Sequence, residues 1–357
     1  MSAEAKAPDP WRSIALEPPR AWGETPVSGA LRVELADFDV EERLGFAPDG
    51  GEAHRLLLVE KIGANTLFVA RALAVRAGKL AADIGFAGLK DRRAVARQWF
   101  SVPASRDTAS FVGYSGEGFR VLTEHPHSRK LRRGALAGNR FHIRVRGLQG
   151  DARAVEARIG HLVAAGVPNY YGLQRFGRDG ANLGRVRTWL ASGRLPRGRE
   201  PRGFLLSAAR SLAFNAVLAS RVGASTWNRL LPGEVVNLSG SRSVFTAEHP
   251  DEGLQRRLGE GDVSPTGPLC GAGGVLPGGE AARVEAAALA AVAPVPALLA
   301  AVGMRGERRA LVLRPGALRH RLDADVLDLE FELPRGAFAT TVLRELLDVR
   351  VPEPADD

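Results

Sequence analysis

Two stretches far apart in the sequence alternate apolar and charged residues with the two-residue period of a β-strand. In residues 141–146 the apolar members are Phe141, Ile143 and Val145, and the residues between them are basic. In residues 327–333 leucine and phenylalanine alternate with aspartate and glutamate, which gives an acidic outer face. Each stretch is expected to turn one face to a core and the other to solvent. Because strands near both ends flank a different middle region, we expect an α+β fold in which a second domain interrupts the first.

A polar turn lies between two further extended segments in the first half of the chain. Residues 84–88 read as a short glycine-rich strand, and residues 98–102 as a second strand ended by Pro103. The turn between them contains Lys90, Asp91 and two arginines. Loops held by flanking strands often carry catalytic residues. Taken alone, however, an aspartate in a polar turn is more often a turn former or a surface charge.

The other patterns predict an extended segment over residues 31–40 and several helices. In residues 64–77 apolar residues recur at helical spacing, with Asn65 or Thr66 as the N-cap and Gly78 as the terminating residue. Glycine and proline dominate residues 259–279, which we predict to be a plain loop. Further helices are predicted over residues 151–166, 207–223, 280–289 and 338–347.

The composition is that of an ordinary soluble protein. The 357 residues suffice for two domains, with 45% hydrophobic and 25% charged residues. The longest apolar run, residues 286–301, contains two prolines and is not a convincing membrane span. Residues 1–24 lack the basic head and apolar stretch of a secretory signal. We therefore expect a cytoplasmic protein without a membrane partner.

Cysteine and histidine usage argues against a metal site. The single cysteine, Cys270, excludes an internal disulfide and a cysteine-rich zinc site, and it reads as a small loop or core residue. His125 and His127 could share a strand face, but Pro126 lies between them and no carboxylate or cysteine follows nearby. We expect no bound metal.

The charge balance is compatible with a polyanionic partner. The net charge is +9, and most basic residues are arginines, which suit bidentate phosphate contacts and stacking on bases. Codon bias toward arginine and alanine explains the same balance equally well. Residues 169–177 gather aromatic, arginine and amide side chains that suit base stacking and edge hydrogen bonds. A polar-aromatic hinge is an equally good interpretation of that segment.

Many segments, taken in order, together resemble the TruD family of tRNA pseudouridine synthases. The resemblance spans about residues 31–347 and fades between residues 224 and 302. Chance agreement of so many spaced segments is negligible. They are residues 37–42, 61–66, 86–91, 93–95, 98–99, 130–131, 134–136, 138–141, 168–172, 174–177, 182–183, 207–210, 338–340 and 343–346.

The resemblance implies a fold and an activity. The fold would be a pseudouridine-synthase catalytic domain with a largely antiparallel central sheet, formed by residues 31–165 and 314–350 and interrupted by an inserted α/β domain, residues 166–313. Residues 1–30 would be a flexible lead. The activity would be the isomerisation of uridine to pseudouridine without a cofactor. Its usual bacterial target is uridine 13 of tRNA, and no obligate protein partner is evident.

The resemblance also assigns roles to residues. Asp91 takes the place of the nucleophile, and Arg32 that of its basic partner. A base that leaves its stack needs a flat apolar surface and an amide that reads its edge. The residues that would hold the flipped uridine are Phe38, Asn139, Phe141 and Phe338. Supporting positions are Lys90, Asn169, Gln174 and Arg175. Two residues depart from the family pattern, Leu89 where a polar residue is frequent and Tyr171 where phenylalanine is usual.

Two other functions use the same residues. A catalytically silent RNA-binding or RNA-refolding protein would need the basic surface but not Asp91. A nucleoside- or glycoside-cleaving hydrolase would use Asp91 as its nucleophile and a second carboxylate as acid, for which Glu42 is the neighbouring candidate.

Overall fold

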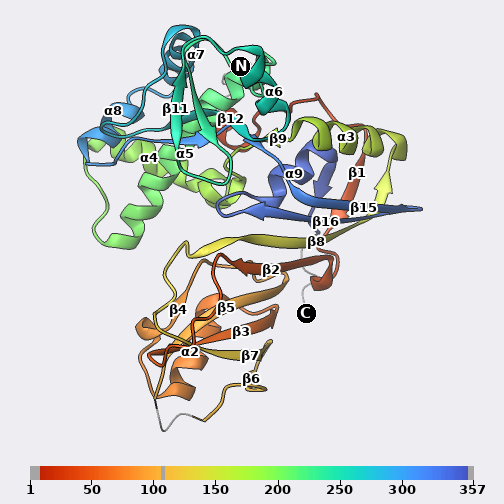
Figure 1. Ribbon diagram of the computed structural model, residues 1–357, viewed down its shortest axis with the longest axis vertical. Coiled ribbons are helices and arrows are strands. Elements are labelled where there is room, and N and C mark those ends of the chain that lie inside the picture. The colour runs from red at the N-terminus through yellow and green to blue at the C-terminus, as the bar shows by residue number, and fades with distance from the viewer. Residues whose placement is uncertain (1–8, 106–108, 353–357) are drawn as a thin grey trace, which may run out of the picture. The chain divides into compact units, whose positions relative to one another are not determined.

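The computed structural model describes residues 9–105 and 109–352 (Figure 1). The chain forms two compact units. One, here called the sheet unit, comprises Pro26–Val155, Pro315–Ala339 and Leu347–Asp357. The other, here called the helical unit, comprises Met1–Thr25, Glu156–Arg314 and Thr340–Leu346. Each unit is described by itself.

The sheet unit is built on one eleven-stranded sheet. Its main path runs β15-β16-β8-β2-β5-β3-β7-β6, and β1, β4 and β17 pair at its sides. Only β2 with β5 and β1 with β17 pair in parallel, so the expected largely antiparallel sheet is confirmed. The strands are β1 (Ser28–Leu31), β2 (Phe38–Leu44), β3 (His54–Ile62), β4 (Gly85–Phe86), β5 (Val95–Pro103), β6 (Ser115–Gly116), β7 (Phe119–His127), β8 (Leu136–Gln149), β15 (Gly316–Asp323), β16 (Val326–Pro334) and β17 (Asp348–Arg350).

Both alternating stretches of the sequence are central strands of this sheet. Phe141, Ile143 and Val145 on β8 are buried, and on β16 the acidic residues are more exposed than the buried leucines and Phe331 between them. Charges of opposite sign meet across the outer face, because β16 pairs with β8 in antiparallel register. Arg144 binds Asp328 through Nε at 2.8 Å. The acidic face of one strand therefore complements the basic face of its neighbour.

The strand register aligns side chains in a row across one face of the sheet. Val40 on β2 is paired with Ala96 on β5 and with Phe141 on β8, and Ala96 is paired with Lys61 on β3. Directly paired residues point to the same face. Lys61 is therefore a charged residue on the face that also carries Phe141.

The helix α2 (Thr66–Ala77) packs against this sheet. Asn65 caps it as expected, accepting a hydrogen bond from Leu67 N at 2.9 Å, and Gly78 ends it with a left-handed φ of 62°. Val69 and Leu73 are fully buried against Leu57 and Phe100. The extended segment expected over residues 31–40 is interrupted by a 3-10 turn, Leu35–Asp37, whose Asp37 carboxylate accepts from Glu34 N.

The helical unit surrounds one long helix, α5 (Arg199–Gly223), which begins eight residues earlier than the predicted start at residue 207. Pro201 lies in its first turn, where proline is tolerated. The other helices are α1 (Pro10–Leu16), most of α3 (Ala152–Ala165), α4 (Ala181–Ser192), α6 (Glu252–Gly259), α7 (Gly279–Ala290), α8 (Val295–Ala301) and most of α9 (Ala339–Leu346). The strands are β9 (Val167–Pro168) paired with β14 (Val312–Leu313), and a sheet of β11 (Val244–Ala247), β10 (Glu234–Leu238), β12 (Val263–Leu269) and β13 (Glu307–Ala310).

Two segments of this unit differ from the sequence expectation. Residues 10–16, expected within a flexible lead, form α1, because Trp11 and Ala15 are buried in the apolar core of α4, α5 and α8. Residues 1–8 lie outside the described residues. The predicted loop over residues 259–279 contains the strand β12. Its Gly267 is needed for packing, since a Cβ there would lie 2.9 Å from Leu311 and 3.1 Å from Phe214.

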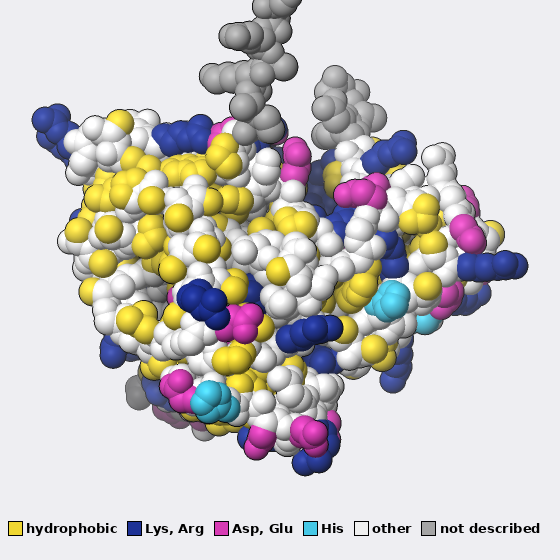
Figure 2. Space-filling model, turned by 90° about the horizontal axis from the view of Figure 1, so that it is seen from above, with side chains coloured by type: hydrophobic (Ala, Val, Ile, Leu, Met, Phe, Trp, Pro, Cys, Tyr) yellow, Lys and Arg dark blue, Asp and Glu magenta, His cyan; other side chains and the backbone are white. Residues whose placement is uncertain are grey.

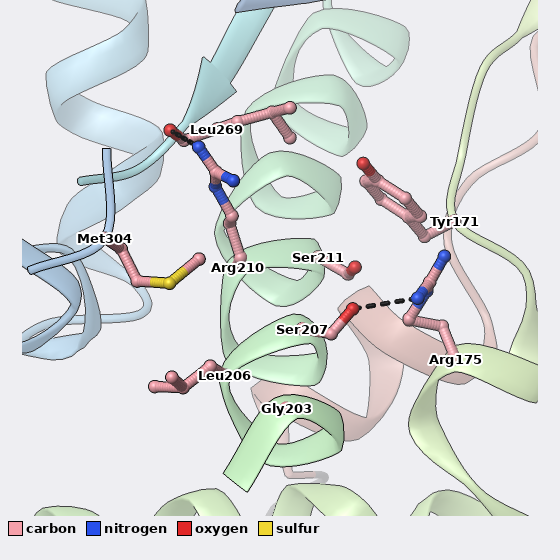
Figure 3. Close-up of a pocket in the computed structure, with 9 residues that line it drawn as sticks. All are labelled: Tyr171, Arg175, Gly203, Leu206, Ser207, Arg210, Ser211, Leu269 and Met304. Carbon is pink, nitrogen blue, oxygen red and sulfur yellow. Dashed lines mark hydrogen bonds between the residues drawn. The ribbon is translucent and has the colours of Figure 1, made fainter. Parts of the chain in front are cut away.

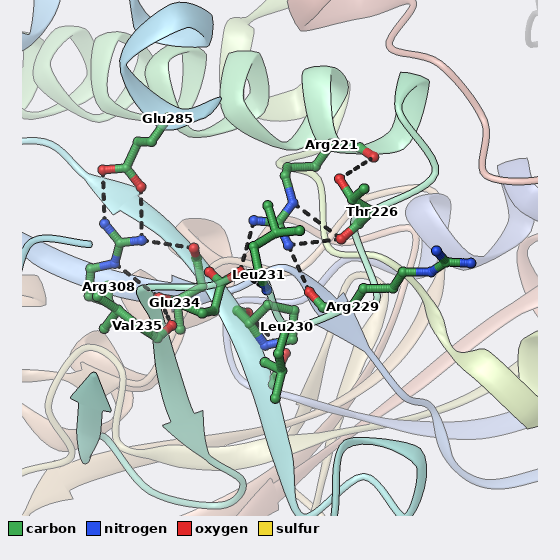
Figure 4. Close-up of polar contacts among 12 residues, drawn as sticks. Arg221, Thr226, Arg229, Leu230, Leu231, Glu234, Val235, Glu285 and Arg308 are labelled. Carbon is green, nitrogen blue, oxygen red and sulfur yellow. Dashed lines mark hydrogen bonds and ion pairs between the residues drawn. The ribbon is translucent and has the colours of Figure 1, made fainter. Parts of the chain in front are cut away.

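Charged residues are buried in pairs beneath α5 (Figure 4). Arg221 Nη1 lies 2.9 Å from Glu234 Oε2, and the same guanidinium donates to the carbonyls of Thr226 and Arg229. Nearby, Arg308 binds both oxygens of Glu285. Burial raises the pKa of Glu234, which Arg221 opposes. These bonds satisfy charges that would otherwise be costly to bury.

In length and apolar composition α5 would suit a membrane span, and it is the only single helix of the described residues that does. Of the 18-residue window that meets this description, 67% is buried inside the protein, so core packing accounts for its apolar character. On the face that Figure 2 shows, arginine and lysine side chains stand in separate small groups among apolar and neutral ones. The positive net charge is thus not gathered into one block on that face.

Candidate active site

Asp91 and Arg32 form a close ion pair in the sheet unit. Asp91 lies in the loop between β4 and β5, and Arg32 directly follows β1. Arg32 Nη2 lies 2.5 Å from Asp91 Oδ2, with 15% and 36% of the two side chains exposed. Arg32 has a φ of 61°, a left-handed conformation that costs a non-glycine residue roughly 1–2 kcal/mol. Its carbonyl is held by Arg93 Nη2 at 3.1 Å.

A series of aromatic rings in contact with one another begins at this ion pair. The guanidinium carbon of Arg32 lies 4.2 Å from the centroid of the Phe38 ring. Phe38 meets Phe141 edge to face at 6.0 Å, and Phe141 stacks on Phe331 at 5.5 Å. The structure therefore brings Asp91, Arg32, Phe38 and Phe141 into one continuous cluster within the sheet unit.

Asn139 lies two residues before Phe141 on β8 and so faces the same side of the strand. Its Oδ1 is buried and has no hydrogen-bond partner among the described residues. Leaving a buried acceptor unpaired costs about 1–3 kcal/mol. A ligand with an N–H group could remove that cost.

A chain of hydrogen bonds holds the backbone of the Asp91 loop. Gln98 Nε2 donates to the carbonyl of Gly88 at 2.7 Å. The other end of the same amide, Oε1, accepts from Thr66 Oγ1 at 3.0 Å, and Thr66 Oγ1 accepts from Lys90 N at 3.1 Å. Since Gln98 is on β5 and Thr66 begins α2, the loop is fixed to two rigid elements.

Lys61 holds the same loop from beneath. It is fully buried, and its Nζ donates to the carbonyls of Asp91 and Ala64, each at 3.0 Å. Burial lowers the pKa of Lys61 to about 8, although the nearby charge of Asp91 acts in the opposite direction. Lys61 is not among the site residues expected from the sequence. Its role could have been suspected from the sequence, because it is a lysine at a core-facing position of β3, where the other inward residues are Leu57 and Val59.

Lys90 turns away from the Asp91 carboxylate. Its Nζ lies 2.8 Å from Glu42 Oε1, and the two side chains are 10% and 0% exposed. The other oxygen of Glu42 accepts from Trp99 N at 3.0 Å. Glu42 therefore acts as an acceptor that fixes the loop, which leaves the acid role required of a hydrolase without support in this geometry.

The other expected site residues come from later segments of the chain. Phe338 belongs to the sheet unit, where it follows β16, directly precedes α9 and is half-buried. Asn169 belongs to the helical unit, where it is buried and binds Arg309 Nη2 and the Ala310 carbonyl. Gln174 is exposed in the 3-10 turn Leu173–Phe176, and Arg175 Nη1 donates to Ser207 Oγ.

Within residues 9–105 and 109–352 no group of three histidine, cysteine, aspartate or glutamate side chains could hold a metal ion. Cys270 is buried as expected, and burial raises the pKa of its thiol to about 11.

Comparison with known proteins gives one consistent result. Residues 19–197 and 199–346 match the family described as tRNA pseudouridine synthase D (TruD). A protein named tRNA pseudouridine synthase D from Azotobacter vinelandii is 46% identical over 335 residues, covering 93% of this chain and 94% of that protein. One of the same name from Methylococcus capsulatus is 44% identical over 332 residues, covering 92% and 94%.

The fold also matches a solved structure. A crystal structure from Methanosarcina mazei, described as a candidate tRNA pseudouridine synthase D (TruD), superposes with a TM-score of 0.71. The match covers 96% of this chain and 98% of that one at 21% sequence identity.

Proposed function

This chain belongs to the tRNA pseudouridine synthase D (TruD) family, and on that premise we propose that it isomerises uridine 13 of tRNA to pseudouridine with Asp91 as nucleophile. The observation that carries the proposal is the cluster in the sheet unit. There a carboxylate is paired with a guanidinium beside two edge-to-face aromatic rings. On this proposal the sheet unit is the catalytic domain, and the helical unit contains the inserted domain that binds RNA.

The chemistry suits these residue types. The N1–C1′ bond of uridine breaks and a bond from C5 to C1′ replaces it, while C5 loses a proton and N1 gains one, so the net change is an isomerisation that consumes no cofactor. A carboxylate engages the sugar or the base during the exchange. Arg32 places a guanidinium group beside the Asp91 carboxylate.

The target base must first leave its stack. Phe38, Phe141 and Phe338 would offer apolar surfaces to the flipped ring. The unpaired Oδ1 of Asn139 would accept a hydrogen bond from the N3–H of uracil, which supplies the missing donor. Cytosine carries no hydrogen on N3 and at that position would leave this acceptor unpaired, so the residue favours uridine over cytidine.

The loop contacts have a positioning role in this scheme. Lys61, Gln98 and Thr66 bind the backbone of Asp91 and of the residues just before it, and leave the Asp91 side chain to Arg32. Small displacements of a catalytic group lower rates strongly. We infer that these contacts hold the carboxylate in its reactive position.

The test is an incubation of the purified protein with an unmodified tRNA transcript, without added cofactor. Carbodiimide chemistry then maps pseudouridine. We expect one new pseudouridine, at position 13. A transcript that stays unmodified would contradict the proposal, and release of free uracil would favour a hydrolase instead. Unchanged RNA that is nevertheless bound would favour a silent RNA-binding protein.

A further inference from the structure

The helical unit contains a pocket that the proposed chemistry does not use (Figure 3). Its volume is about 230 Å³. One wall is a single face of α5, since the lining residues Gly203, Leu206, Ser207, Arg210 and Ser211 recur at helical spacing. Tyr171 and Arg175 line the pocket on one side of this helix, and Leu269 and Met304 line it on the other (Figure 3). All nine lining residues belong to the helical unit.

Two arginines present donors in this pocket. Arg175 Nη1 donates to Ser207 Oγ at 2.8 Å (Figure 3). Arg210 Nη2 donates to the Leu269 carbonyl at 3.0 Å, and Arg210 lies 3.3 Å from Glu307. The Nε of Arg210 is buried and has no hydrogen-bond partner among the described residues. An anion at this point would satisfy that donor.

A third guanidinium adds to the positive charge. Arg309 lies 4.3 Å and Arg175 5.3 Å from the centroid of the Tyr171 ring. Burial lowers the pKa of Arg309, and the charge of Arg175 lowers it further. An anion bound between Arg175 and Arg210 would be attracted by both guanidinium groups.

The rest of the lining is apolar. Leu206, Leu269 and Met304 offer hydrocarbon and thioether surface on the side of the pocket away from the Tyr171 ring (Figure 3). The volume lies below the roughly 300–1,000 Å³ of pockets for drug-sized ligands. It therefore suits one planar ring with a small anionic group, rather than an extended ligand.

We propose that this pocket binds one unpaired nucleotide of the RNA substrate, with its phosphate on Arg175 and Arg210 and its base among Tyr171, Leu206 and Met304. Base stacking on aromatic or guanidinium planes and phosphate contacts by arginine are the usual means of holding single-stranded RNA. The proposal rests on the proposed function for the identity of the RNA. It gives the segment 169–177 a role as a binding wall, through Tyr171 and Arg175.

The test narrows the pocket without removing any existing contact. Gly203 is exposed, and a Cβ there would meet nothing within 4 Å, so Gly203→Phe places a ring at the pocket rim. Gly184→Phe is the matched control, because Gly184 is also exposed, on α4, with nothing within 4 Å of a Cβ. Replacing glycine inside a helix does not lower helix propensity, so both variants are expected to fold.

Binding of tRNA is measured directly in an Asp91→Asn background, so that no turnover occurs. Gly203→Phe is expected to raise the Kd by about 10-fold, in the range for the loss of one stacked base, and Gly184→Phe by less than about 2-fold. Arg175→Gln is expected to reduce the slope of log K against log salt by about 1, as for one lost phosphate contact. Unchanged affinity in Gly203→Phe would overturn the proposal.

Two further outcomes separate this proposal from others. Protein with intact Asp91 is assayed in parallel for pseudouridine. If it forms none while Gly203→Phe still weakens RNA binding, the proposed function fails and the pocket assignment holds. Uridine 5′-monophosphate is the second probe. If it binds the native protein while Gly203→Phe leaves tRNA affinity unchanged, the pocket takes a free nucleotide and the RNA assignment is overturned.

Discussion

Arg32 Nη2 and Asp91 Oδ2 lie 2.5 Å apart although 59 positions separate the two residues in the chain. The contact depends on the sheet, because Arg32 follows β1 and Asp91 follows β4. Phe38 lies under the same guanidinium, which thus contacts both the carboxylate and the first ring of the aromatic cluster. Arg32 is therefore the residue that joins the charged and the apolar parts of the candidate site.

Replacing Arg32 should lower activity without unfolding the protein. Arg32→Met removes the positive charge beside Asp91, and we expect kcat to fall by roughly 10²–10³, the usual effect of losing one stabilising electrostatic group in an active site. Arg32→Lys keeps the charge but loses the planar fork, so an intermediate loss is expected. Arg43→Met is the control, since Arg43 forms an exposed ion pair with Glu332 on the same sheet. Equal rates for Arg32→Met and Arg43→Met would contradict the assignment.

The buried pair of Lys90 and Glu42 should matter for stability as well as rate. Lys90→Met leaves the fully buried Glu42 carboxylate without its cation, which typically costs about 3–5 kcal/mol. The double change Lys90→Met with Glu42→Leu removes both charges and should recover most of that loss. Urea unfolding measures the free energy of unfolding of the single and of the double variant. A single variant as stable as the native protein would show that the pair does not hold the Asp91 loop.

The lowered pKa of Lys61 predicts that the free energy of unfolding changes with pH within a definite range. Its pKa falls from an ordinary 10.5 to about 8 on folding. Below pH 8 both states carry the proton, whereas between pH 8 and 10.5 the unfolded chain binds more protons than the folded one. The native unfolding free energy should therefore rise with pH across that window, relative to Lys61→Met, by on the order of 3 kcal/mol. The exposed Lys79→Met is the control and should show no such difference.

A flat pH dependence of the difference between native protein and Lys61→Met would mean that Lys61 keeps its ordinary pKa in the folded state. The same variant also tests positioning, because it removes the bonds to the Asp91 and Ala64 carbonyls. A lower kcat at unchanged KM is expected, and rescue by Lys61→Arg is not, since the buried space fits an ammonium group.

Local patterns predicted the elements that have a clear period or cap. The helix at Thr66–Ala77 follows from Asn65 and Gly78, and the faces of β8 and β16 follow from strict alternation. The strand β12 was missed because Pro265, Gly267 and Pro268 are read as loop residues. Here Gly267 instead permits close packing against Phe214, a tertiary effect that local sequence does not display.

The site was predictable only in part for a similar reason. The resemblance placed Asp91, Arg32, Phe38 and Phe141, which the structure brings together, but their roles stay predictions until they are tested. Lys61 and Gln98 act through backbone carbonyls of a loop, and no spacing in the sequence reveals such contacts. The one indication in the sequence was that these charged or polar residues occupy strand positions that face the core.

The most direct test of the central claim is the rate of pseudouridine formation by Asp91→Asn under single-turnover conditions on a tRNA transcript. Asp83→Asn is the matched control, because Asp83 is an aspartate of the same unit whose carboxylate accepts from Leu80 N outside the cluster. We expect Asp91→Asn to lose at least about 10³-fold in rate, as for removal of a nucleophile, while tRNA affinity and the Asp83→Asn rate stay near native. Pseudouridine formed by Asp91→Asn at the native rate would contradict the account.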